Sequence, residues 1–159
     1  MKKRFTLSLP KGFTIIELLM MMGIILLLGG GVVAAFNNFN ENQRVKQAAL
    51  SLKSNLRLAQ NKAISGEKPA VGCTTLVGYS VSFTATSYTT QAQCNSGPAG
   101  SSSVTNLPSG VSFVPVPSML TFSVITGRIA SNTTITLSGL NKTYSLTVAG
   151  SGNVSTVGF

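Results

Sequence analysis

The stretch KGFTIIELLMMMGIILLLGGG, residues 11–31, is almost entirely apolar but carries one carboxylate, Glu17, near its start. The apolar run extends from Phe13 to Phe36 and is interrupted only by Thr14, Glu17 and glycines. As a helix this run would measure about 36 Å, which is enough to cross a bilayer. The sequence therefore predicts a membrane-spanning helix over residues 13–36, and Glu17 requires an explanation.

The composition argues against catalysis. The chain has 159 residues, a formal net charge of +9 and only 9% charged residues, with no His and no Asp. General acid–base catalysis commonly uses a His or a tuned pair of carboxylates, and metal sites need clustered His, Cys or carboxylates. Because the three glutamates are strung along the N-terminal half, we expect no enzyme activity, no metal site and no cofactor.

Three interpretations of the apolar run compete. A secretory signal peptide could be cut after the small residues 33–35, but its apolar core usually has only about 7–15 residues. A plain membrane anchor would keep the basic residues Lys2, Lys3, Arg4 and Lys11 on the cytoplasmic side. Such an anchor gains nothing from Glu17, because a charge at the bilayer centre costs about 3 kcal/mol.

The third interpretation explains the glutamate. A basic leader ending in Gly12, then Phe13, then a glutamate at Glu17 resembles the processing motif of type IV prepilins. The resemblance implies that a prepilin peptidase cuts between Gly12 and Phe13 and methylates the new amine of Phe13. It also implies that Glu17 pairs with the N-terminal amine of a neighbouring subunit during assembly. Elementary electrostatics agrees, since a positive partner offsets the cost of a carboxylate among apolar helices.

Three consecutive glycines, Gly29–Gly31, are unusual inside a helix, where each costs about 1 kcal/mol relative to Ala. In pilin filaments, the resemblance implies, part of the N-terminal helix melts near this depth. We expect these glycines to mark that stretch. The alternative is that small residues allow neighbouring helices to pack closely.

An amphipathic helix is predicted over residues 37–66, ended by the Gly and Pro of the segment 65–69. Apolar residues recur at helical spacing along it and should pack on a sheet. They are Val45, Ala48, Ala49, Leu52, Leu56, Ala59 and Ala63.

A basic stripe, defined here as Lys46, Lys53 and Arg57, follows an adjacent face of this helix. Such a stripe could contact DNA phosphates. A solvated helix face or a contact with neighbouring subunits is the alternative. Arg128 is a further basic residue that could contact nucleic acid.

Residues 67–159 read as a β-rich domain. Short apolar and polar alternations separated by Gly, Pro and Asn turns, without intervening helices, predict antiparallel sheets. The expected strands cover 79–83, a segment ending at Cys94, 111–116, 120–125, 133–138, 143–148 and 153–157, with a flexible loop over 95–110 and turns at 138–142 and 149–153.

The chain contains two cysteines, Cys73 and Cys94. If the domain is exported, a disulfide bond between them is the natural interpretation. Two reduced, buried thiols are the alternative.

The C-terminal pattern resembles the minor pilins and pseudopilins of the FimT/GspH type. The residues that carry this resemblance are Phe122, Gly127, Ile135, Leu137, Tyr144, Leu146, Val148 and Gly152. The resemblance implies an α+β type IV pilin fold, with a long N-terminal helix packed on antiparallel sheets. FimT-like proteins that bind DNA carry a Gly-Arg-x-Arg segment near the C-terminus, whereas this chain has GNVS at residues 152–155. The resemblance therefore does not extend to the DNA-binding segment, and DNA is a less favoured partner of this tail.

The resemblance as a whole implies a prepilin leader over residues 1–12 and a structural subunit of a type IV pilus or a type II secretion pseudopilus. The expected partners are other pilin subunits, the prepilin peptidase, the inner-membrane assembly platform and, before assembly, the membrane itself. The expected location is the inner membrane, with a single span, and then an extracytoplasmic or surface filament. A DNA-binding minor pilin and a major pilin are the alternatives.

Overall fold

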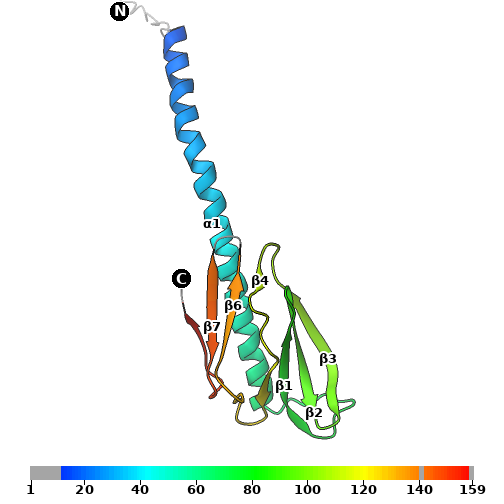
Figure 1. The fold of residues 1–159 in the computed structure, drawn as a ribbon. Coiled ribbons are helices and arrows are strands. Elements are labelled where there is room, and N and C mark those ends of the chain that lie inside the picture. Colours follow the sequence, from blue (N-terminus) through cyan, green and yellow to red (C-terminus); the bar gives the residue numbers. More distant parts are fainter. Residues whose placement is uncertain (1–11, 140–141, 158–159) are drawn as a thin grey trace, which may run out of the picture. The chain divides into compact units, whose positions relative to one another are not determined.

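The computed structural model describes residues 12–139 and 142–157 (Figure 1). The chain divides into two compact units, Met1–Phe39 and Asn40–Phe159. Residues 1–11 of the predicted leader lie outside the described residues.

One helix, α1 (Ile15–Ile64, 50 residues), contributes to both units. The predicted segments 13–36 and 37–66 are therefore parts of a single helix. Gly29–Gly31 are helical in this single chain. Once a helix is nucleated, each added residue contributes one more hydrogen bond, and this compensates for the low helix propensity of glycine. The expected melting concerns the packed filament and stays a prediction.

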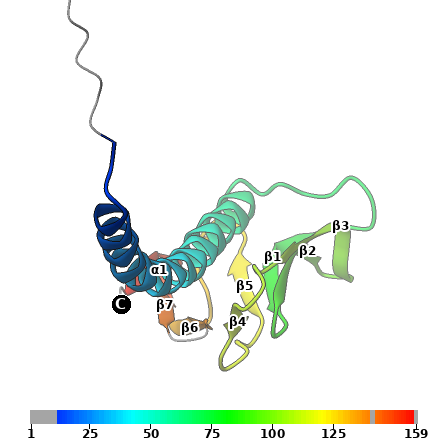
Figure 2. The same cartoon turned by 90° about the horizontal axis from the view of Figure 1, so that it is seen from above.

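In the second unit, α1 buries one face. All seven apolar residues predicted on that face, from Val45 to Ala63, are at most 4% exposed. Figure 2 shows this part of the helix lying against both sheets. The predicted amphipathic face is therefore confirmed.

Within the described residues, eight strands form two antiparallel four-stranded sheets, which lie side by side against this part of α1 (Figures 1 and 2). Sheet A has the order β3-β2-β1-β5, and sheet B has the order β4-β6-β7-β8. The bounds are β1 Leu76–Phe83, β2 Ser87–Cys94, β3 Gly97–Asn106, β4 Ser112–Phe113, β5 Leu120–Ser123, β6 Thr133–Ser138, β7 Thr143–Val148 and β8 Val154–Val157. The predicted α+β class, with a helix on antiparallel sheets, is confirmed.

Three sequence-based predictions of strands and loops were wrong in part. The predicted flexible loop over 95–110 contains β3, which pairs with β2 along its length. β4 ends before Pro115, which has no N–H to donate to a sheet. β5 ends at Ser123 because the next residues turn, with Ile125 in the left-handed region at φ 68°.

The helix and both sheets share one hydrophobic core. Its largest buried side chains include Tyr88, Phe122 and Leu52. The Phe83 and Phe113 rings contribute an edge-to-face contact, with ring centroids 5.3 Å apart. A Cβ at Gly78 would overlap the Phe122 carbonyl oxygen, so the pairing of β1 with β5 requires glycine there.

Candidate functional site

The predicted processing site lies just before helix α1. Gly12 and Phe13 are not helical, and both are exposed; Phe13 is 74% exposed. A Cβ at Gly12 would meet no other atom within 4 Å, so the described fold does not require glycine there.

Thr14 caps the first turn of α1, directly ahead of Glu17. The Thr14 carbonyl accepts hydrogen bonds from the amides of Glu17 (3.1 Å) and Leu18 (3.2 Å). The Thr14 hydroxyl oxygen also accepts one from the Glu17 amide, at 3.3 Å. A Thr followed three residues later by a Glu is the sequence signature of a capping box, and sequence analysis missed it. Glu17 is therefore also a favourable residue for starting this helix, because its charge complements the helix dipole.

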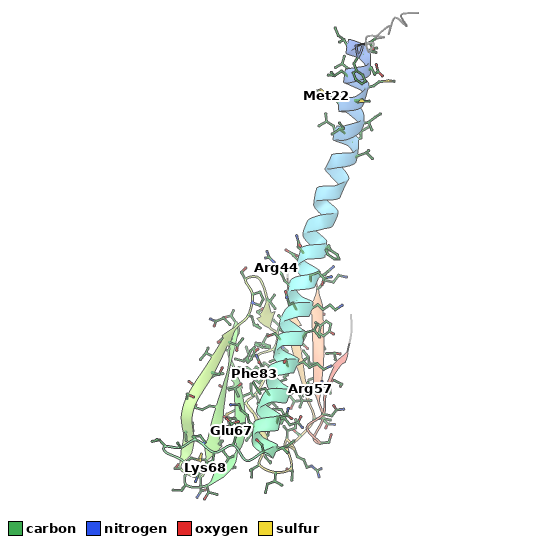
Figure 3. All side chains as sticks on the ribbon, turned by 180° about the vertical axis from the view of Figure 1, so that it is seen from behind. Met22, Arg44, Arg57, Glu67, Lys68 and Phe83 are labelled. Atoms are coloured by element: carbon green, nitrogen blue, oxygen red, sulfur yellow. A yellow bond between two sulfur atoms is a disulfide. The ribbon has the colours of Figure 1, made fainter. Side chains whose placement is uncertain are left out.

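The apolar surface that follows is uncovered within the chain. Thirteen large apolar side chains between Phe13 and Leu28 are each at least 54% exposed, around the whole circumference of the helix. Met22, labelled in Figure 3, is one of them. The carboxylate of Glu17 makes no hydrogen bond or ion pair with another described residue. A helix that is apolar on every face is stable in water only when something covers it.

The described residues contain no helix with the combination of length and hydropathy required to cross a membrane.

The disulfide predicted between Cys73 and Cys94 is present, with the two Cα atoms 5.5 Å apart. It joins the segment after α1 to the end of β2. The Ser96 hydroxyl donates to the Gly72 carbonyl (3.1 Å), and the Asn95 amide donates to the Thr75 carbonyl (3.0 Å). These contacts hold the loop after the helix against sheet A.

The basic stripe lies on α1, in the second unit. Lys46 and Arg57 are exposed, and Lys53 is half-buried. Arg57, labelled in Figure 3, donates a hydrogen bond to the Val154 carbonyl on β8, at 3.4 Å. Part of the Arg57 guanidinium is therefore used within the fold.

Arg128 lies on a different element, the segment between β5 and β6, where it is exposed. Its carbonyl accepts a hydrogen bond from the Ser123 amide. The turn at Gly152, which matches the place of the basic segment in DNA-binding FimT-like proteins, is packed inward. A Cβ at Gly152 would overlap the Gly127 carbonyl oxygen, and φ there is +88°. This turn therefore has a role in packing the sheet ends.

A polar cluster at the end of α1 was not predicted. The Lys62 ammonium and the Glu67 carboxylate form an ion pair at 2.9 Å, and the Lys62 nitrogen lies 5.8 Å from the centre of the Tyr79 ring. The hydrogen bond to Glu67 raises the pKa of Lys62, although burial opposes this. Burial raises the pKa of Tyr79, with a further contribution from the Glu67 charge. Lys62 and Glu67 are five positions apart across the helix end, a spacing that helix periodicity alone does not pair.

Comparison with known proteins points to the fold. No protein-family profile and no curated protein sequence matches the chain. The crystal structure of the type IV minor pilin FimU from Pseudomonas aeruginosa (strain PAO1) is similar, with a TM-score of 0.53. The match covers 70% of this chain and 91% of that chain, at 14% sequence identity. The chain therefore has the type IV pilin fold, with an N-terminal helix packed on antiparallel sheets.

Proposed function

We propose that this chain is a structural subunit, a minor pilin or pseudopilin, of a type IV pilus or a type II secretion pseudopilus. The observation that carries the proposal is the uncovered apolar surface of α1 between Phe13 and Leu28, combined with the pilin fold. Copies of such a helix can cover one another in a filament, which removes the exposed apolar surface from water. The chain acts by assembly and performs no catalysis.

Glu17 gives this assembly its register. In a bundle of apolar helices an unpaired carboxylate is costly, and a positive amine from a neighbour offsets that cost. Cleavage between Gly12 and Phe13 creates such an amine at the start of the mature chain. The other subunits in the bundle are therefore the main partners, and the prepilin peptidase, which also methylates Phe13, is the enzyme that prepares the chain.

Before assembly, we place the chain in the inner membrane, held by residues 13–36 as a single span with the basic leader on the cytoplasmic side. The membrane then covers the same apolar residues that neighbouring subunits cover later. The assembly platform in that membrane transfers the subunit from lipid to filament. The final location is an extracytoplasmic or surface filament.

The minor-subunit assignment draws on the FimU structure, which is described as a type IV minor pilin. Two alternatives have less support. A major pilin would have the same helix but would dominate the filament by mass. A DNA receptor would need basic groups that are free to contact phosphate, and Arg57 is partly used by the Val154 carbonyl.

Intact-mass spectrometry of filaments sheared from the native host tests the proposal. We expect a minor species that begins at N-methylated Phe13 and lacks two hydrogens, because Cys73 and Cys94 are joined. A dominant species of the same mass would make the chain a major pilin. A processed form found in the membrane and absent from filaments would favour the pseudopilus. A chain that begins at Phe36 would overturn the proposal, because it would be a secreted protein.

A further inference from the structure

A pocket of about 270 Å³ lies in the second unit, where α1 ends against sheet A. The helix contributes Asn55 and Lys62 to one wall, and the loop after the helix contributes Glu67 and Lys68. Figure 3 shows the labelled Glu67 and Lys68 beside the end of the helix and the green strands of sheet A. The pocket is independent of the filament proposal, because none of its residues belongs to the N-terminal apolar segment.

The floor of the pocket is a row of small hydroxyls. β2 and β3 pair so that Tyr88 faces Thr105 and Thr90 faces Ser103. Tyr88 is buried in the core, whereas its β3 neighbours on this face are small, polar and partly exposed. A sheet face that adjoins a core is normally apolar. The hydroxyls of Thr90, Ser101, Ser103 and Thr105 make no hydrogen bond within the described part of the chain, so they are available to a ligand.

The loop between α1 and β1, residues 65–75, forms the second wall of the pocket and is held in place by several bonds. The Lys62–Glu67 ion pair fixes its start, and the Tyr79 hydroxyl donates to the Glu67 carbonyl at 2.9 Å. The Lys68 ammonium donates to the Thr74 carbonyl at 3.2 Å, which folds the loop back on itself. Because the Cys73–Cys94 disulfide ties the end of this loop to β2, the wall cannot move freely from the floor.

Where the loop crosses β3, the Gly100 backbone packs closely against the Pro69 ring. Gly100, at φ +72°, lies so near Pro69 that an added Cβ would be 2.9 Å from the proline ring. The two residues line the same pocket. The pocket is therefore built by packing, a disulfide and hydrogen bonds, and is not a chance gap between loops.

The lining defines the chemistry of a ligand. Hydroxyls both donate and accept hydrogen bonds, which matches a ligand that carries several hydroxyls of its own. Asn55 uses an amide N–H on the Tyr88 hydroxyl, at 2.6 Å, so its oxygen can accept another bond. Lys62 is neutralised by Glu67, whereas Lys68 has no ion-pair partner among the described residues. The pocket therefore carries one excess positive charge.

One exposed apolar side chain lies beside these polar groups. Leu58, which is 53% exposed, offers contact for C–H groups, and the buried Ala59, Ala92 and Ala99 lie behind the polar groups. The volume is slightly below that of pockets for drug-sized molecules, which favours a ligand the size of a single sugar ring. We propose that this pocket binds a small acidic sugar, a hydroxyl-rich pyranose ring that carries one carboxylate.

Calorimetric titration of the oxidised full-length chain in detergent micelles tests the assignment, with D-glucuronate as the probe and D-glucose and acetate as controls. We expect saturable binding of glucuronate, with glucose at least about tenfold weaker because it lacks the charge. Acetate should not compete at equal concentration. No binding of glucuronate up to about 10 mM, equal binding of glucose, or full competition by acetate would each overturn the proposal.

Matched variants locate the site. Thr105→Val removes one floor hydroxyl at nearly constant shape, and Lys68→Gln removes the unpaired charge. We expect each to weaken glucuronate binding by about fivefold or more. Thr134→Val on β6 and Lys53→Gln on the basic stripe are the controls, and they should leave the affinity unchanged. If the controls weaken binding as much as the pocket variants, or if the pocket variants have no effect, the sugar binds elsewhere and the proposal is wrong.

Discussion

The amide of Glu17 donates a hydrogen bond to the side-chain oxygen of Thr14, and the two atoms lie 3.3 Å apart. The glutamate that we assign to filament assembly is thus also part of the structure that starts the helix. These two roles depend on different atoms. The cap uses the Glu17 backbone and the Thr14 hydroxyl, whereas assembly uses the Glu17 carboxylate.

Substitutions can separate the two roles. Glu17→Gln keeps the backbone bond to Thr14 but removes the charge, so we expect filaments that incorporate the subunit to disappear. Thr14→Val removes the cap and should cost about 1 kcal/mol of helix stability while assembly continues. Complementation of a deletion strain, followed by filament shearing and immunoblotting, measures both effects.

Glu41→Gln is the matched control for Glu17→Gln, because it removes a charge from the same helix in the second unit. We expect normal assembly. If Glu17→Gln also assembles normally, or if Thr14→Val fails as completely as Glu17→Gln, the charge is not what positions the subunit.

The buried face of α1 should dominate the stability of the second unit. Leu52 is fully buried and Leu50 is 47% exposed, although they are only two positions apart on the same helix. Leu52→Ala should lower the free energy of unfolding by about 2–5 kcal/mol, because it leaves a cavity. Leu50→Ala should change it by about 0.5 kcal/mol or less. Urea denaturation followed by circular dichroism compares them, and similar losses would contradict the assigned face.

The Cys73–Cys94 bond should stabilise the fold by restricting the unfolded chain. In the chain-entropy model a loop of this length contributes about 3 kcal/mol. We expect a Cys73→Ser, Cys94→Ser double variant to unfold at lower urea concentration than the oxidised protein. Addition of reductant should shift the parent protein toward the double variant and leave the double variant unchanged. An unchanged midpoint in the parent would show that the bond contributes little.

Alkaline pH should weaken the fold at the end of α1. The pKa values of Tyr79 and Lys62 are both raised in the folded state, by burial and by the hydrogen bond to Glu67 respectively. The folded state therefore keeps protons that the unfolded state has already lost, and stability falls as the pH rises above about 10. Tyr79→Phe should show a shallower fall in unfolding free energy between about pH 9 and 11. Parallel curves for the two proteins would contradict this.

Binding to DNA, if it occurs through the basic stripe, should be weakly salt dependent. Three cations can release only a few counterions, so a plot of log affinity against log salt should be no steeper than about −3. Gel shifts with the full-length chain and a Lys53→Gln, Arg57→Gln variant measure this slope. Tight binding with a slope near −3 that the variant abolishes would revive the DNA-receptor alternative, whereas a much steeper slope would show that cations outside the stripe carry the binding.

Periodic patterns in the sequence predicted the parts of the fold that face the core. The apolar spacing from Val45 to Ala63 identified the buried helix face. Short β-type segments between turn residues located β6 and β7 at the residues where the structure has them. Each of these elements buries one face. Apolar residues therefore recur in the sequence at the period of the helix or strand. The two cysteines also paired as expected.

β3 could not be found in this way. Its inner face lines the pocket beside the core, so Ser and Thr stand where apolar residues would mark a strand. The Lys62–Glu67 ion pair and the pocket could not be predicted from the sequence either. They depend on how the chain turns after the helix, and local sequence does not specify which distant strands that turn meets. The short β4 and β5 were overestimated because apolar residues such as Val114 and Ile125 remain exposed in turns.

For the filament subunit that we propose, the disulfide has a mechanical consequence. The bond between Cys73 and Cys94 encloses β1 and nearly all of β2 in a covalent ring. Tension that travels along the backbone crosses this ring through the sulfur atoms, so the hairpin inside it cannot be pulled straight. With about 3.5 Å for each extended residue, the ring withholds roughly 70 Å of chain length from any stretching force. An oxidised subunit would therefore yield less length under load than a reduced one.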